Sequence, residues 1–240
     1  MAGAAQERSG AALERSRVDF GRPPVTETIL GVQFLPLRRL TLPYIGVFWG
    51  EVRTEYPSQE VKPALSPVVE DFSGVPGPEG GLGIQVMTET DVRCWFIDDT
   101  STQLIQVQRD RFIRNWRKGQ PPQHDEYPRY DVLRPRFATD WQRFVAFLER
   151  EGLGRPEINQ CEVTYVNHVE LGVGWEKLGE AHKVLGMLRG MEKREILPEP
   201  EIVILNARYL MPEGRGRLHV SAQPAIRRSD GKQVLQLTLT

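Results

Sequence analysis

Apolar and polar residues alternate along much of the chain, and this pattern predicts β-strands. Residues 26–35 alternate in this way, with Leu30, Val32 and Phe34 on one face. The same alternation, or a short apolar run between turn residues, predicts further strands at 83–88, 92–97, 103–109, 161–171, 201–209, 217–222 and 232–240.

A second pattern, with apolar residues three and four positions apart, predicts helices. It covers residues 42–56, where Thr41 is placed to cap the helix and Pro57 ends it. It returns at about 139–151, which carries Trp141, Phe144 and Leu148, and again at 178–188.

The remaining segments are rich in proline, glycine and charge. Residues 57–81 and 119–135 are predicted to be long irregular connections, with a short edge strand at 66–72 in the first of them. Residues 1–22 lack periodicity and are predicted to form a flexible N-terminal tail. Residues 23–240 are then expected to form a single α+β domain.

The order of these elements repeats. Each half, about 23–155 and 156–240, reads as a strand, a helix and three strands. This order predicts a duplicated unit that forms a largely antiparallel sheet with helices packed on one face. The arrangement is saddle-like or helix-grip-like, and such a fold analogy carries no functional weight.

Composition narrows the class of protein. The 240 residues are 40% hydrophobic and 26% charged, which excludes a fully disordered or fibrous chain. The net charge is -1, whereas a wholesale polyanion binder is normally more basic. No apolar run has membrane-spanning length and the N-terminus lacks a secretory pattern, so the expected location is cytoplasmic. Cys94 and Cys161 both fall in strand-like runs and are expected to be buried, reduced thiols.

Four stretches carry a resemblance to a known family: PPVTETILGVQF (23–34), QVQRDRFIRNWR (106–117), YPRY (127–130) and VTYVNHV (163–169). Together they resemble an uncharacterised, sporadically distributed bacterial protein family. His168 stands where that family tends to have an arginine. The resemblance implies a cytoplasmic bacterial protein of accessory character, encoded on mobile or defence-linked DNA, and it supplies no catalytic residues.

One segment combines arginines with aromatic rings, which is the chemistry that single-stranded nucleic acids require. The candidate nucleic-acid contacts are Arg109, Arg111, Arg114, Trp116, Arg117 and Lys118. The alternative is that Trp116 packs in the core and the arginine side chains extend over it.

Other candidates are weaker. Asn167 is a polar residue on an apolar strand face and, with Tyr165, is a candidate lining of a ligand pocket between sheet and helices. A buried asparagine that hydrogen bonds to the backbone is the alternative. The histidine, cysteine and serine spacings match no metal, nucleophile or phosphate-loop motif, so neither a cofactor nor a metal is predicted.

The last strand places Leu235, Leu237 and Leu239 on one face, and no helix follows to cover them. They are predicted to form a self-association or partner surface at an edge of the sheet. The pattern as a whole favours a non-enzymatic binding or assembly protein. The alternatives are a nucleic-acid-associated component of a defence or mobile-element system, and a small-ligand binder or enzyme.

Overall fold

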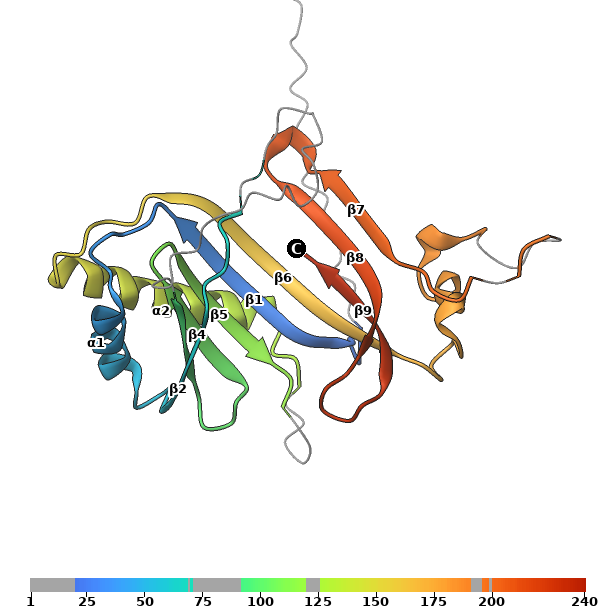
Figure 1. Ribbon diagram of the computed structural model, residues 1–240, viewed down its shortest axis with the longest axis horizontal. Helices are drawn as coiled ribbons and strands as arrows, with labels where there is room; N and C mark the ends of the chain where they lie inside the picture. Colours follow the sequence, from blue (N-terminus) through green and yellow to red (C-terminus); the bar gives the residue numbers. More distant parts are fainter. Residues whose placement is uncertain (1–19, 69, 71–91, 120–125, 191–195, 199) are drawn as a thin grey trace, which may run out of the picture.

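The computed structural model describes residues 20–68, 70, 92–119, 126–190, 196–198 and 200–240. In this part of the chain, nine strands form one antiparallel sheet in the order β2-β3-β4-β5-β1-β6-β9-β8-β7 (Figure 1). The predicted flexible tail, apart from its last residues, and the predicted strand at 83–88 lie outside the described residues. The α+β class with a large antiparallel sheet is confirmed.

The first half of the chain contributes five strands and both α-helices. Their bounds are β1 Val25–Phe34, α1 Leu42–Val52, β2 Ser58–Pro63, β3 Val92–Ile97, β4 Gln103–Gln108, β5 Arg111–Arg117 and α2 Tyr130–Arg150.

The second half contributes four strands and three short 3₁₀ helices. Their bounds are β6 Ile158–Glu170, η1 Leu178–Lys183, η2 Gly186–Leu188, β7 Leu205–Leu210, η3 Pro212–Gly214, β8 Arg217–Ile226 and β9 Gln233–Leu239.

Four expected features differ from the structure, and three of them lie in the first half of the chain. No strand forms at Ser66 or Val68; the edge strand of this region is β2, which pairs with β3. α2 begins at Tyr130, within the expected loop, because Leu133 in its first turns is fully buried near Trp116. Thr41 precedes α1, but its side chain makes no capping hydrogen bond.

The fourth difference is the helix expected at 178–188, which is replaced by η1 and η2. Gly179 packs so closely on the chain at Pro200 that a β-carbon there would lie 1.8 Å from the Pro200 carbonyl oxygen. Gly186 weakens helix formation between the two short turns, since glycine loses most backbone freedom in a helix. The apolar residues of this segment do pack inward, as their spacing predicts, but the two glycines allow a tighter and more irregular path.

α1 and α2 cover one face of the first five strands in order along the sheet (Figure 1). We call this the helix face. Phe112 of β5 and Phe34 of β1 contact Phe144 of α2, and Phe48 of α1 contacts Phe144 edge to face. Large aromatic side chains contribute most of the buried apolar area in such a core, so these rings fix both helices on the sheet.

A buried ion pair also joins α2 to the sheet. The Arg114 Nε donates to Asp140 Oδ2 at 2.7 Å, and both side chains are almost fully buried. Burial raises the pKa of Asp140, and the charge of Arg114 opposes this shift. The Tyr56 hydroxyl lies 3.4 Å from the same carboxylate, and burial raises the pKa of Tyr56 to about 12.

The predicted terminal edge strand is wrong, because β9 pairs with β6 on one side and with β8 on the other. Among the described strands, the edges of the sheet are β2 and β7. Leu235 is buried against Trp175 and Ala181, whereas Leu237 and Leu239 are half-buried. A row of three uncovered leucines therefore does not occur.

The two cysteines differ in environment. Cys94 is buried among the apolar residues of the helix face, as expected, and burial raises the pKa of its thiol. Cys161 is exposed, which corrects the expectation that both thiols are buried. Of the helices that the structure describes, none combines the length and apolarity needed to cross a lipid bilayer.

Phe144→Ala is expected to lower the free energy of unfolding by about 3–5 kcal/mol, because it removes a fully buried ring from the aromatic core. Trp141→Ala is expected to cost less, since Trp141 is only partly buried. Urea denaturation of the two variants and the unchanged protein measures both effects. Equal midpoints for all three proteins would contradict this core.

Candidate functional site on the open face of the sheet

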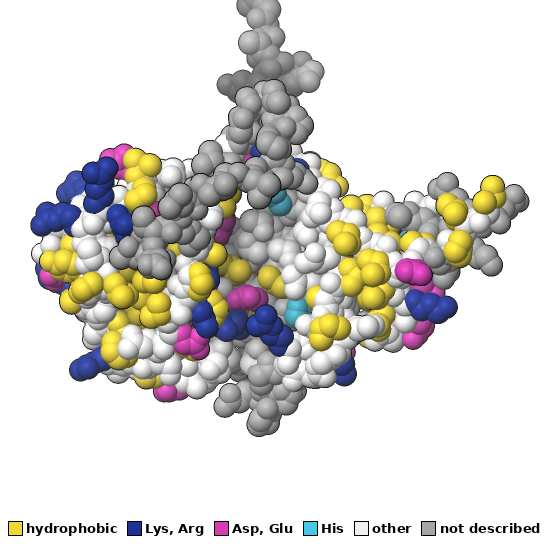
Figure 2. Space-filling view, viewed as in Figure 1, with side chains coloured by type: hydrophobic (Ala, Val, Ile, Leu, Met, Phe, Trp, Pro, Cys, Tyr) yellow, Lys and Arg dark blue, Asp and Glu magenta, His cyan; other side chains and the backbone are white. Residues whose placement is uncertain are grey.

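The face of the sheet opposite α1 and α2 carries basic and acidic side chains (Figure 2), and the strand register places the amides of Gln33 and Asn115 there as well. We call it the open face. Because side chains alternate between the two faces of a strand, Arg111, Asn115 and Arg117 of β5 lie on the open face. Phe112, Arg114 and Trp116 lie on the helix face.

The predicted nucleic-acid strip is therefore divided between two faces. Arg114 pairs with Asp140 in the core, and Trp116 is buried against Leu133 and Tyr127. Arg109 lies in the turn before β5 and is half-buried. Lys118 is exposed after the strand, where its backbone N–H donates to Thr26. The strip does not form one basic-aromatic surface, and nucleic-acid contact by Arg117 and Lys118 stays a prediction.

Arg111 belongs to a second structural feature, a chain segment that crosses over the open face. We call residues 64–68 the strap. The Gln108 side chain accepts from Leu65 N–H and donates to Leu65 O, both at 3.0 Å. Arg111 donates to Ser66 O at 3.0 Å.

Gln33 of β1 holds the end of the strap. Its amide donates to Val68 O at 2.8 Å and accepts from Val68 N–H at 2.9 Å, and it also donates to Asn159 of β6 at 3.0 Å. Figure 1 shows the chain after β2 running across β1 and β6. Side chains of the sheet thus pair with the backbone groups of the strap, as a neighbouring strand would otherwise do. This role accounts for the burial of the polar residues Gln33, Gln108 and Arg111.

Elsewhere on the open face, three cations surround the indole ring of Trp95. The Lys62 Nζ, Arg93 Cζ and Arg117 Cζ atoms lie 5.0, 5.4 and 5.1 Å from the ring centroid of Trp95. These distances are within the range of cation–π contact. We call Lys62, Arg93, Trp95, Arg117 and the neighbouring Glu27 the Trp95 cluster.

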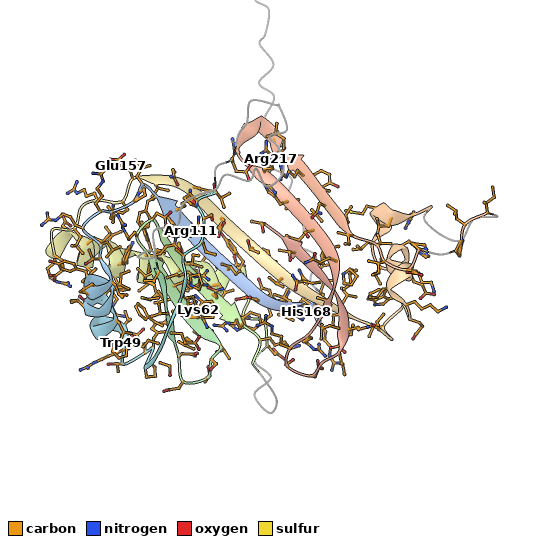
Figure 3. The ribbon with its side chains drawn as sticks, viewed as in Figure 1. Trp49, Lys62, Arg111, Glu157, His168 and Arg217 are labelled. Atoms are coloured by element: carbon orange, nitrogen blue, oxygen red, sulfur yellow. The ribbon has the colours of Figure 1, made fainter. Side chains whose placement is uncertain are left out.

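Strand register brings the cluster together. Lys62 of β2 lies opposite Arg93 of β3. One strand further in, β4 carries Gln106 opposite Trp95, and β5 then carries Arg111 and Arg117. Figure 3 shows Lys62 and Arg111 on the same face over these strands. Residues far apart in the sequence thus form one basic area.

Several donors of the cluster are buried without a hydrogen-bond partner among the described residues. They are Nε of Arg93, Nε1 of Trp95, and Nε and Nη2 of Arg117. By contrast, the indole N–H groups of Trp49 and Trp175 donate to Tyr56 O and Glu170 O, at 3.0 and 2.8 Å. Buried donors are normally satisfied, so the unpaired donors of the Trp95 cluster require an explanation.

Charge within the cluster is unbalanced. The nearest carboxylate to Arg117 is Glu27, at 3.9 Å, and Glu27 accepts from Asn115 at 2.7 Å. Burial raises the pKa of Glu27, although the Asn115 hydrogen bond and the charge of Arg117 oppose the shift. Burial and the charge of Arg111 lower the pKa of Arg93. A bound anion would raise the pKa of Arg93 again. At Glu27, burial favours the neutral, protonated carboxyl over the carboxylate.

A cavity of about 580 Å³ lies further along the sheet, and no residue of the Trp95 cluster lines it. It is lined by β6, β8 and the chain near Glu70, with Cys161, Glu162, His219 and Thr240 among its walls. The His219 Nε2 lies 2.7 Å from Glu70 Oε1, and Arg217 pairs with the same carboxylate. Arg217 is the first residue of β8 and is labelled in Figure 3.

The predicted ligand-lining residues lie elsewhere. Tyr165 is half-buried on the helix face beside Tyr127, and burial raises the pKa of its hydroxyl. Asn167 is buried and donates to Leu237 O at 3.1 Å, which is the backbone-satisfied alternative. Neither residue lines the 580 Å³ cavity.

Sequence reasoning missed Lys62, Arg93 and Trp95. The signal was present, because Arg93 and Trp95 flank Cys94 in a predicted strand and must share the face opposite to it. Only the register of β2 and β5 shows that Lys62 and Arg117 meet them there.

No model of a protein family matches this chain, and no curated protein matches it. The resemblance to a sporadically distributed bacterial family therefore stays a prediction. Among the described residues, no three His, Cys, Asp or Glu side chains are grouped so that they could hold a metal ion. The chemistry that the open face does offer is hydrogen-bond donation and positive charge.

Gln33→Leu is expected to lower the free energy of unfolding by about 1–3 kcal/mol, because it removes the hydrogen bonds that the buried Gln33 side chain makes with Val68 and Asn159. Limited proteolysis is expected to cut residues 64–68 faster in this variant. Gln142→Leu, at an exposed position on α2, is the matched control and is expected to change neither property. Identical cleavage in both variants would show that Gln33 does not hold the strap.

Proposed function

We propose that the chain is a non-enzymatic binding protein whose Trp95 cluster holds a phosphate-bearing ligand on the open face of the sheet. The observation that carries the proposal is the gathering of Lys62, Arg93 and Arg117 around Trp95 with buried donors that have no partner. A phosphate group presents several acceptor oxygens and negative charge, which is what these donors lack.

The composition of the cluster supports phosphate over other anions. Arginine guanidinium groups donate in a fixed fork that matches phosphate and carboxylate oxygens, and lysine adds a compact charge. Lys62 also pairs with Glu60 at 2.5 Å, at the outer edge of the cluster, which leaves the two arginines as the inner donors. A ligand with more than one phosphate could contact both.

The same composition supports binding rather than catalysis. The cluster consists of cations, an indole ring and the carboxylate of Glu27, which accepts from Asn115, and Glu60 at its edge pairs with Lys62. None of these groups is a nucleophile paired with a base, which is the usual arrangement for covalent catalysis.

Single-stranded nucleic acid is the second candidate ligand. Arg117 and the exposed Lys118 follow each other at the end of β5, and phosphates of a strand could contact both. Three cations already lie over the ring of Trp95, so the cluster fits phosphate contacts better than base stacking. A ligand with a few phosphates is therefore the first choice.

We also infer that the two halves descend from one repeated unit. In the first half, the opening strand β1 pairs with the closing strand β5, and β4, β3 and β2 follow outward. In the second half, β6 pairs with β9, and β8 and β7 follow outward. The matching order supports the duplication predicted from the sequence. A protein-contact surface at β9, formed by the half-buried Leu237 and Leu239, stays a prediction, as does a cytoplasmic location.

Calorimetric titration with pyrophosphate tests the proposed function. The unchanged protein is expected to bind saturably, and Arg93→Gln and Arg117→Gln are each expected to weaken binding by about tenfold or more, since each removes a charged donor. Arg155→Gln, at an exposed arginine far along the chain from the cluster, is the control and is expected to bind normally.

The pH dependence has a defined sign. Because the pKa of Glu27 is raised in the folded protein, Glu27 takes up its proton at a higher pH than an ordinary glutamate. Anion affinity is therefore expected to rise as pH falls through that range, and Glu27→Gln is expected to remove this rise. The folded state also binds this proton more tightly than the unfolded state does. The contribution of Glu27 to the free energy of unfolding is therefore present below its unfolded pKa and is lost as pH rises through its folded pKa.

Two results would contradict the proposal. One is the absence of saturable pyrophosphate binding at low ionic strength. The other is binding that Arg93→Gln and Arg117→Gln leave unchanged. If a short oligothymidylate binds far more tightly than pyrophosphate, with a steep dependence on salt, the nucleic-acid candidate replaces the first choice.

A further inference from the structure

Three polar side chains on the open face form a hydrogen-bonded chain that ends beside Trp95. The Asn115 Nδ2 donates to Glu27 Oε1 at 2.7 Å, and the Gln106 Nε2 donates to Asn115 Oδ1 at 2.7 Å. Gln106 lies opposite Trp95 in the pairing of β3 with β4. We call Glu27, Asn115 and Gln106 the amide relay. It leads from the carboxyl group on β1, across β5, to the strand that adjoins Trp95.

The carboxylate fixes the direction of each hydrogen bond in the relay. An ionised carboxylate only accepts, so Asn115 turns its N–H donors to Glu27 and its oxygen to Gln106. Gln106 must then turn its own N–H donors to Asn115, which leaves its Oε1 at the far end. Among the residues that the structure describes, this buried oxygen accepts no hydrogen bond. A buried acceptor without a donor is costly, and on the adjoining strand the indole N–H of Trp95 is unpaired as well.

Glu27 has different neighbours on its two sides. On the β5 side it faces Asn115 and Arg117, and the positive charge of Arg117 acts on it. On the β6 side it lies opposite Val166, and the closest titratable residue of β6 on the same face is His168. Burial favours the protonated form of Glu27 more than Arg117 favours the carboxylate, so its pKa is raised. A negative charge bound nearby would favour the protonated form further.

We propose that the amide relay transmits the protonation of Glu27 to the phosphate site, where it changes Gln106 from an acceptor into a donor. A protonated carboxyl has an O–H donor, which donates to Asn115 Oδ1 once that amide has turned over. Asn115 then donates to Gln106 Oε1, and the N–H donors of Gln106 turn to the Trp95 cluster. The step takes one proton from solvent onto Glu27 and otherwise changes only the orientation of two amides. This inference rests on the proposed phosphate site.

The two states of the relay prefer different anions. When Glu27 is ionised, Gln106 Oε1 requires a donor, and hydrogen phosphate supplies one with its P–OH group. When Glu27 is protonated, Gln106 offers N–H donors, which suit a fully ionised anion such as sulfate. Arg93 and Arg117 donate to either anion. The relay therefore makes the site selective for hydrogen phosphate over sulfate at high pH, and this selectivity is lost at low pH.

Sulfate is the probe for the test, because it stays fully ionised while Glu27 titrates. Calorimetric titration in two buffers with different enthalpies of ionisation gives the number of protons taken up with each sulfate. The unchanged protein is expected to take up close to one proton just above the pH range in which free Glu27 titrates. Its sulfate affinity is then expected to rise by up to about tenfold for each unit by which pH falls.

Glu27→Gln fixes the relay in its second state, because the glutamine amide donates to Asn115 as the protonated carboxyl does. This variant is expected to bind sulfate at high pH as tightly as the unchanged protein does at low pH. It is expected to take up no proton and to lose the preference for hydrogen phosphate.

Gln106→Met separates the relay from simple repulsion between Glu27 and the anion. Methionine has nearly the length of glutamine but is at most a weak acceptor. The relay predicts that this variant loses most of the proton uptake and the selectivity for hydrogen phosphate, whereas repulsion alone leaves the uptake unchanged. Gln103→Met is the matched control, because Gln103 lies on the same strand but opposite Trp116 on the helix face. It is expected to behave as the unchanged protein does.

Sulfate binding without proton uptake, or uptake that Gln106→Met leaves unchanged, would overturn the relay. Both results are compatible with the phosphate site, which pyrophosphate binding tests by itself. If neither pyrophosphate nor sulfate binds at any pH, the phosphate site and the relay fail together. If Gln106→Met does not fold, the selectivity between the two anions decides. Equal selectivity at high pH in the unchanged protein and in Glu27→Gln would then overturn the relay.

Discussion

The pairing of β1 with β5 and with β6 is the constraint on which the rest of the structure depends. β1 is the central strand of the sheet, and it joins the two halves of the chain through antiparallel registers on both of its edges. Because side chains alternate between faces, these registers decide which residues enter the core. Leu30, Val32 and Phe34 are thereby placed on the helix face, and Gln33 is placed on the open face.

The same registers make the two faces different in chemistry. On the helix face, aromatic packing around Phe144 holds α1 and α2, and Arg114 with Asp140 adds a buried ion pair. On the open face no helix of the described chain supplies an apolar cover. Polar side chains instead hold the strap, and beyond the strap the basic groups of the Trp95 cluster have donors without partners.

The sequence predicted much of the fold and little of the site, for physical reasons. Alternation identified β1 and β6, and the helical stripe identified α1 and part of α2, because both signals are local. The glycines that turn residues 178–188 into short 3₁₀ helices and the burial of Leu133 act through distant contacts. In the sequence, Arg111 reads as a surface arginine, yet in the structure it donates to the backbone of the strap. Lys62 reaches Trp95 only because β2 pairs with β3.

The central claim is that the Trp95 cluster is a binding site for phosphate groups. The most direct measurement is the position of the Trp95 indole N–H resonance, assigned with Trp95→Phe, during titration with pyrophosphate. If phosphate binds at the cluster, this resonance shifts saturably, while those of Trp49 and Trp175, which donate to backbone carbonyls, stay fixed. An unchanged Trp95 resonance at saturating pyrophosphate would contradict the central claim.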